Sequence, residues 1–84
     1  MAEAMPPFFA KIYSSFATIY EGEVYAAHIS GEEGEFEVFA EHTPLFSSAS
    51  HGALQIKAPQ ETVKHHFKAA IIQMVNDKLF IYVA

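Results

Sequence analysis

Cysteine is absent from this chain of 84 residues. Its absence excludes disulfide frameworks, thiolate zinc sites, iron–sulfur clusters and cysteine nucleophiles. Arginine is absent too, so the basic residues are five lysines, and the formal net charge at pH 7 is −5. An acidic surface without bidentate arginines does not suit a phosphate backbone. We therefore expect no nucleic-acid partner.

Long apolar runs are also missing from the sequence. No run approaches the ~20 residues that a membrane span needs, and the start, Met1-Ala2-Glu3, lacks the basic and apolar regions of a signal peptide. We expect a soluble, cytoplasmic chain. Its length suits a single domain over 1–84 with residues 1–7 as a flexible lead-in, and so short a chain buries only ~60% of its unfolded surface.

What the sequence does contain is a succession of short strand patterns. Turn signals recur about every 8 to 12 residues, and no window shows a sustained helical period, which predicts an all-β fold, a small antiparallel β-sandwich of about ten short strands. The expected strands include 8–13, 16–20, 23–29, 36–38, 45–48, 53–57, 62–68, 69–75 and 79–83. We expect a bulge or bend at Gly22, a turn at His51-Gly52 and a hairpin turn at Asn76-Asp77-Lys78.

The stretch Gly31 to Leu45, GEEGEFEVFAEHTPL, combines a turn, a strand and a loop. Two glycines bracket a pair of glutamates, which suits a hairpin turn with a residue at positive φ. Pro44 cannot donate to a sheet ladder, so His42 to Leu45 is expected to form an extended loop. Because one short strand separates turn and loop, we expect them to form one contiguous patch; the alternative places them at opposite ends of that strand, ~14 Å apart.

Five histidines and three serines are the side chains that could carry out metal binding or catalysis. The histidines are His28, His42, His51, His65 and His66. Because His65 and His66 are adjacent in a predicted strand, their side chains should point to opposite faces, so we expect no metal site and no bound cofactor. Ser47, Ser48 and Ser50 lack the glycine pattern of a nucleophile elbow, so no catalytic residue is expected.

An acidic cluster and a single lysine leave alternatives open. The cluster comprises Glu32, Glu33, Glu35, Glu37 and Glu41, and it is either a solvated sheet edge or a docking surface for a basic partner. Lys78 at the tip of an apolar hairpin is similar to the carrier lysine of lipoyl domains. The second hypothesis for function is therefore a stand-alone β carrier, or a ligand- or metal-binding module that uses Lys78 or a histidine site.

Four segments together resemble a known family. They are Tyr20-Glu21-Gly22-Glu23-Val24, Gly31-Glu32-Glu33-Gly34-Glu35-Phe36, His42-Thr43-Pro44-Leu45 and Gly52-Ala53-Leu54-Gln55-Ile56-Lys57. In this order and spacing they resemble the N-terminal β-sandwich of the epsilon subunit of F-type ATP synthases. The resemblance runs from about Phe8 to the end of the chain.

The resemblance implies a rotor component of the central stalk that performs no chemistry itself. It implies docking on the gamma subunit and on the c-subunit ring, at the cytoplasmic face of a bacterial inner membrane. The residues expected at the ring are Glu32, Glu33, Gly34, Glu35, His42, Thr43, Pro44 and Leu45. Because Ala84 falls where the family's last strand ends, we also expect this form to lack the C-terminal helical hairpin, and with it ATP binding and inhibition of hydrolysis.

Overall fold

The computed structural model describes residues 6–40 and 44–84, and every regular element in these two ranges is a strand. The strands are β1 (Phe8–Tyr13), β2 (Thr18–Val24), β3 (Ala26–Gly31), β4 (Gly34–Val38), β5 (Leu45–Lys57), β6 (Thr62–Val75) and β7 (Lys78–Val83). None of these described residues forms a helix that would be long and apolar enough to cross a membrane.

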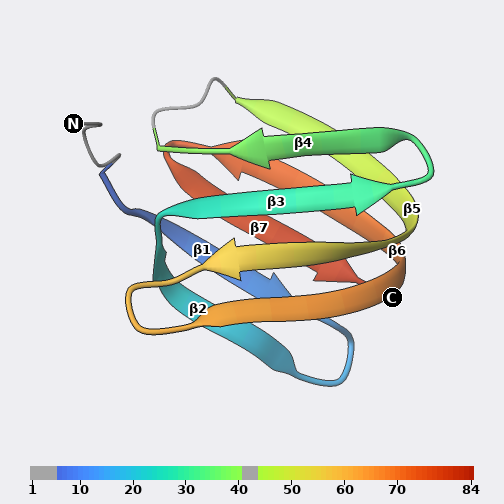
Figure 1. Ribbon diagram of the computed structural model, residues 1–84, viewed down its shortest axis with the longest axis horizontal. Helices are drawn as coiled ribbons and strands as arrows, with labels where there is room; N and C mark the ends of the chain where they lie inside the picture. The colour runs from blue at the N-terminus through green and yellow to red at the C-terminus, as the bar shows by residue number, and fades with distance from the viewer. Residues whose placement is uncertain (1–5, 41–43) are drawn as a thin grey trace.

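The strands form one hydrogen-bonded sheet, which folds over on itself into two layers. The order across the sheet is β2-β1-β7-β6-β5-β3-β4, and all neighbours are antiparallel except β1 and β7. In Figure 1, β3 and β4 lie in front and β1, β2 and β7 lie behind, while β5 and β6 curve from one layer into the other. The predicted all-β sandwich is therefore confirmed.

The predicted number of strands was too high because β5 and β6 are each twice as long as expected. The ladder between them runs without a change of register from Leu45 opposite Met74 to Lys57 opposite Thr62. The turn expected at His51-Gly52 is thus wrong: His51 adopts φ 49°, which bends β5 while its pairing with β6 continues. We call the region 50–52 of β5 and 67–69 of β6 the shared bend.

At the shared bend, the side chains that face the core change from odd-numbered to even-numbered positions. Before it, Ala49 of β5 faces the core, and after it the core residues of β5 are Leu54 and Ile56. Strand β6 makes the same change between Phe67 and Ala70. We call residues 26–38, 53–57 and 62–67 the front layer, and residues 8–24, 45–49 and 70–83 the back layer. The core lies between the two layers.

Glycine is required where the shared bend meets β3. A Cβ added to Gly52 would lie 1.7 Å from the backbone oxygen of Ser30 and 2.7 Å from the Cα of Gly31. Both neighbours are backbone atoms of a paired strand, so neither can move without disturbing the ladder between β3 and β5. The absence of a side chain at position 52 lets the two strands approach at the bend.

The two predicted hairpin turns are confirmed, and the bulge or bend predicted at Gly22 is wrong. Gly31 pairs with Gly34, which has φ 127°, so Glu32-Glu33 form the turn between β3 and β4. Asn76 and Asp77 both have positive φ between β6 and β7, the backbone that a two-residue hairpin turn needs. Gly22 instead lies inside β2, which continues to Val24.

Substituting Gly52 by alanine tests the close approach at the shared bend. Because the added Cβ meets backbone oxygen, we expect a loss of about 3 kcal/mol of unfolding free energy, hence a melting temperature lower by roughly 12 °C or no cooperative transition. Thermal unfolding followed by far-UV circular dichroism measures this. The control is Ser48→Ala on the same strand, where the side chain is exposed. An unchanged melting temperature for Gly52→Ala would contradict the packing described here.

Candidate functional site

The acidic turn between β3 and β4 is fixed to the shared bend. The amide of Glu32 donates to the carbonyl of Ser50 over 2.9 Å, and the amide of Ser50 donates to Glu33 Oε1 over 3.0 Å. Both bonds join the turn to the same residue of β5. The turn is therefore an ordered part of the sandwich end, although its glutamate side chains lie in solvent.

The same contacts favour the ionised form of Glu33. The hydrogen bond from the Ser50 amide, assisted by the amide of Glu33 itself and the hydroxyl of Ser50, lowers the pKa of Glu33 below its ordinary 4.5, and His51 adds a smaller lowering effect. Glu33 is thus a carboxylate at neutral pH. It presents a fixed negative charge at this end of the molecule.

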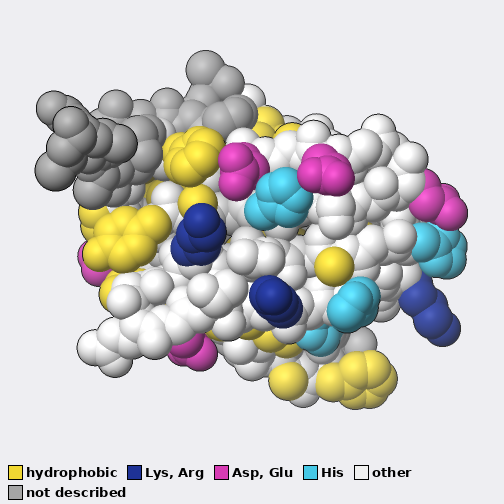
Figure 2. All heavy atoms as spheres, viewed as in Figure 1, with side chains coloured by type: hydrophobic (Ala, Val, Ile, Leu, Met, Phe, Trp, Pro, Cys, Tyr) yellow, Lys and Arg dark blue, Asp and Glu magenta, His cyan; other side chains and the backbone are white. Residues whose placement is uncertain are grey.

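His28 on β3 lies between two further carboxylates of the edge strand β4. Its Nε2 is 3.2 Å from Glu35 Oε1, and its Nδ1 is 3.6 Å from Glu37 Oε2. His28 is paired directly with Glu37 in the sheet, so the three side chains share the outer face of the front layer. Figure 2 shows acidic side chains over β4, a histidine beside them, and lysines farther down the same face.

Of the second predicted segment, the structure describes Pro44 and Leu45, which follow the end of β4 opposite the acidic turn. His42 and Thr43, like Glu41 of the acidic cluster, lie outside the described residues. Pro44 is exposed, and Leu45 begins β5, half-buried against the core. Ser50 lies five residue steps along β5 from Leu45, a span of ~17 Å. For Pro44 and Leu45, the two described residues of this segment, the structure agrees with the alternative arrangement, in which turn and loop lie at opposite ends of β4.

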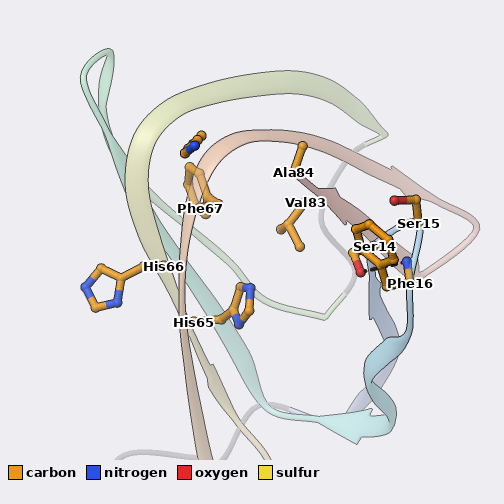
Figure 3. A pocket seen from close by; sticks show the side chains of 9 residues that line it. Ser14, Ser15, Phe16, His65, His66, Phe67, Val83 and Ala84 are labelled. Atoms are coloured by element: carbon orange, nitrogen blue, oxygen red, sulfur yellow. Dashed lines mark hydrogen bonds between the residues drawn. The ribbon is translucent and has the colours of Figure 1, made fainter.

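The other sequence candidates are dispersed. His65 and His66 point in opposite directions from β6, as predicted (Figure 3). In the described residues no three histidine, aspartate or glutamate side chains gather as a metal ion would require. Lys78 is the first residue of β7, paired with Val75 and Phe9, and does not occupy the tip of the hairpin as expected of a carrier lysine.

A large apolar surface, which the sequence pattern did not predict, lies on the outside of the back layer. Phe9 and Tyr13 of β1 project there beside Phe80 and Tyr82 of β7, with ring centroids 6.2 Å apart for Phe9 and Phe80 and 5.4 Å for Tyr13 and Tyr82. We call this surface the aromatic face; its residues are Phe9, Tyr13, Phe46, Ile71, Phe80 and Tyr82.

The aromatic face is apolar yet uncovered within the described structure. Phe46 is 74% exposed and Ile71 is 47% exposed. A solvated sheet normally alternates apolar and polar residues. The sequence does contain one indication of this face. In the segments Phe8–Tyr13 and Lys78–Val83, large apolar residues occupy both the odd-numbered and the even-numbered positions, so both faces of each strand carry them. A contiguous exposed apolar surface is typical of a site that contacts another protein.

Comparison with known proteins gives one consistent family. The model of the family described as ATP synthase, delta/epsilon chain, β-sandwich domain matches residues 8–84. The ATP synthase epsilon chain of Sulfurimonas denitrificans is 35% identical over 54 residues, which are 64% of this chain and 42% of the relative. The epsilon chain of a Psychrobacter species is 28% identical over 74 residues, 88% of this chain and 54% of the relative. This chain spans about half the length of these relatives.

Two solved structures share the fold. One is the central stalk and c-ring of the mitochondrial ATP synthase of Tetrahymena thermophila, with a TM-score of 0.77 at 8% identity, covering 96% of this chain and 66% of that chain. The other is the mitochondrial ATP synthase of Euglena gracilis, with a TM-score of 0.81 at 17% identity, covering 96% of this chain and 51% of that chain. At these identities the likeness concerns the fold.

Substituting Glu33 by glutamine tests the bond between the acidic turn and the shared bend. The pKa of Glu33 is lowered in the folded chain, so its ionised form adds stability above pH 4.5, and this contribution disappears as the pH falls through the lower, folded pKa. We expect Glu33→Gln to melt at a lower temperature than wild type at pH 7, and the two melting curves to converge toward pH 3.

The matched control is Glu32→Gln, which removes the same charge at the neighbouring position, where the backbone and not the side chain bonds to Ser50. Calorimetry at several pH values between 3 and 7 provides the measurement. Equal effects of the two substitutions at every pH would show that the carboxylate of Glu33 does not hold the turn.

Proposed function

We propose, from the premise that this chain belongs to the β-sandwich domain family of the ATP synthase delta and epsilon chains, that it is a rotor component of the central stalk of an F-type ATP synthase. In this role it transmits rotation by contact and has no catalytic residues. It couples the proton-driven rotation of the c-ring to ATP synthesis through its two partners, the gamma subunit and the c-ring. It lies on the cytoplasmic side of a bacterial membrane, held there by the complex.

The observation that carries this proposal is the aromatic face. A rotor component transmits torque only through a contact that does not dissociate during rotation. Persistent interfaces are built around apolar, aromatic cores. The aromatic face supplies such a core, since exposed Ile71 is paired directly with Tyr82, and exposed Phe46 lies across Gln73 from Phe80. It is rigid as well, because its residues stand on the strands that enclose the core.

We assign the aromatic face to the gamma subunit. The central lysine of this face, Lys11, lies with its Nζ 5.5 Å from the centre of the Tyr13 ring, so its charge is partly matched by an aromatic neighbour. Glu21, Glu23 and Lys78 lie on the same face by register. Lys11 is paired directly with Glu21, so the charges of this face partly compensate one another. This composition suits a tight partner within the rotor better than a hydrated membrane-proximal loop.

We assign the acidic end to the c-ring. Glu32, Glu33, Gly34 and Glu35 would face basic residues in the polar loops of the ring. The segment 42–45 would form a second contact with the same partner, since ~17 Å lies within the breadth of a standard interface. Because exposed charges mainly set association rate and salt dependence, this contact would be the more adjustable of the two.

Substituting Phe46 by serine tests the aromatic face. The ring is exposed, so the fold should be kept, while loss of an aromatic anchor should weaken binding to purified gamma subunit by about 2 kcal/mol, roughly thirtyfold in Kd. Surface plasmon resonance with immobilised gamma subunit measures it. The matched control is Phe16→Ser, because Phe16 is exposed in the turn between β1 and β2, away from the aromatic face. Equal affinities for wild type and Phe46→Ser would exclude the aromatic face as the gamma site.

Substituting Glu32 and Glu35 together by glutamine tests the acidic end, with Glu33 left in place because it holds the turn. We expect slower association with purified c-ring and a flatter dependence on salt, with little change in dissociation. Binding kinetics measured at about 50 and 300 mM salt give the association and dissociation rates separately and show how each depends on salt. The control is Glu21→Gln and Glu23→Gln on β2, both exposed. If the Glu32 and Glu35 variant associates as fast as wild type at low salt, the turn is only a solvated edge.

A further inference from the structure

One side of the sandwich is open between two strand edges. Residues 62–67 of β6 pair with β5, whereas β7 joins β6 only from Ala70 onward. Strand β2 pairs with β1 on one side only. In the described part of the chain, no strand occupies the second side of either edge. We call the space between β2 and residues 62–67 the open flank; it lies at the bottom of Figure 1.

A cavity of about 560 Å³ occupies one end of the open flank. Its residues come from the turn after β1, from β6 and from the end of β7: Ser14, Ser15, Phe16, His65, His66, Phe67, Lys68, Val83 and Ala84. Phe67 and Val83 are only 7% and 2% exposed, whereas Phe16 is 95% exposed. Figure 3 shows His65 on the same side of β6 as Val83 and Phe16, with His66 turned away. The cavity thus has an apolar floor and an aromatic ring at its mouth.

The edge strand that borders this cavity is basic on its outer side. Lys64, His66 and Lys68 alternate along β6 with exposed side chains, in a chain whose formal net charge is −5. None of the described residues that line the cavity is acidic. Glu61 lies at the other end of the flank, beside Tyr20. The edge therefore presents two lysines and a histidine outward, and Val63, His65 and Phe67 inward.

We propose that the open flank binds an extended acidic segment of a partner protein, which adds as a strand to residues 62–67 of β6. An unpaired edge offers backbone donors and acceptors that fit an extended chain. Successive side chains of an added strand point to opposite faces. Its carboxylates would therefore lie beside Lys64, His66 and Lys68, and its apolar side chains would enter the cavity beside Phe67 and Phe16.

The segment is expected from another protein, although β4 of this chain has a similar alternation. Glu35 and Glu37 of β4 already lie within 3.2 and 3.6 Å of His28, and Val38 is buried in the core. Pairing β4 of a second copy with this edge would have to draw those carboxylates away from His28. An acidic strand whose carboxylates are not already paired with a basic residue of its own protein would fit this edge better than β4 of a second copy.

The test uses a capped nine-residue peptide in which glutamate alternates with valine and phenylalanine. Two control peptides replace glutamate by lysine or keep the composition but separate the acidic and apolar residues into blocks. We expect only the alternating acidic peptide to bind at up to about 1 mM, and to slow amide hydrogen exchange within residues 62–67 at least about tenfold. Binding is followed by nuclear magnetic resonance of the whole chain.

Reversing the charges at the edge distinguishes binding at this site from nonspecific electrostatic attraction between the peptide and the protein. Lys64→Glu with Lys68→Glu should weaken peptide binding about tenfold at low salt. The matched control is Lys11→Glu with Lys78→Glu, which makes the same charge change on β1 and β7, outside the cavity, and should leave the affinity within about twofold. Both variants must first show the wild-type melting temperature.

Three outcomes would overturn the proposal. They are no binding of the alternating peptide, equal binding of the block-ordered peptide, and equal loss of affinity in the two lysine variants. Sedimentation of the chain without peptide gives a fourth: self-association that Lys64→Glu with Lys68→Glu abolishes would make a second copy the occupant of the edge. Because the peptide contains no part of an ATP synthase, its binding is judged independently of the stalk assignment.

Discussion

The structure depends on the close backbone approach at Gly52, where a side chain would collide with Ser30. This approach lets β5 stay paired with both β3 and β6 while its direction changes. Two long strands can then serve both layers, so a single sheet encloses a core without a second, separate sheet. The same bend provides Ser50 as the residue that binds the acidic turn through Glu32 and Glu33. The shared bend therefore determines both the packing of β5 against β3 and the position of the Glu33 carboxylate on the surface.

The two outer faces of the sandwich differ in chemistry because the two layers use different residues at the outward positions. The back layer places aromatic rings there, as in the pairs of Phe9 with Phe80 and Tyr13 with Tyr82. The front layer places His28 among carboxylates and lysines farther along. Removing an apolar face from water is favourable at any salt concentration, whereas attraction between exposed charges weakens with salt. One molecule thus combines a surface suited to permanent attachment with one suited to adjustable contact.

Features fixed by neighbouring residues were predictable from the sequence, and features fixed by pairing across the sheet were not. The turns at Glu32-Glu33 and Asn76-Asp77 follow from local backbone preferences, and β1 was predicted with its observed bounds. The four family segments predicted the sandwich that the family match confirms. More strands were predicted than the structure contains, because a bend within a strand interrupts the alternation of apolar residues just as a turn between two strands does. The bend at His51 was therefore interpreted as a turn. The aromatic face was missed because Phe8 and Phe9 are both apolar, and only the three-dimensional packing shows that Phe8 is the buried one.

Charge at the two edges of the front layer determines which strands can pair with them. The edge at β4 is acidic, and the edge at residues 62–67 is basic. Charged side chains protect an edge from pairing with a neutral strand, since the charges would lose water without gaining a partner. That protection does not hold against a strand of opposite charge and matching alternation, so two copies of this layer would attract each other edge to edge. His28 opposes this by engaging Glu35 and Glu37 on their own sheet. The basic edge therefore keeps its selectivity for an acidic strand from elsewhere.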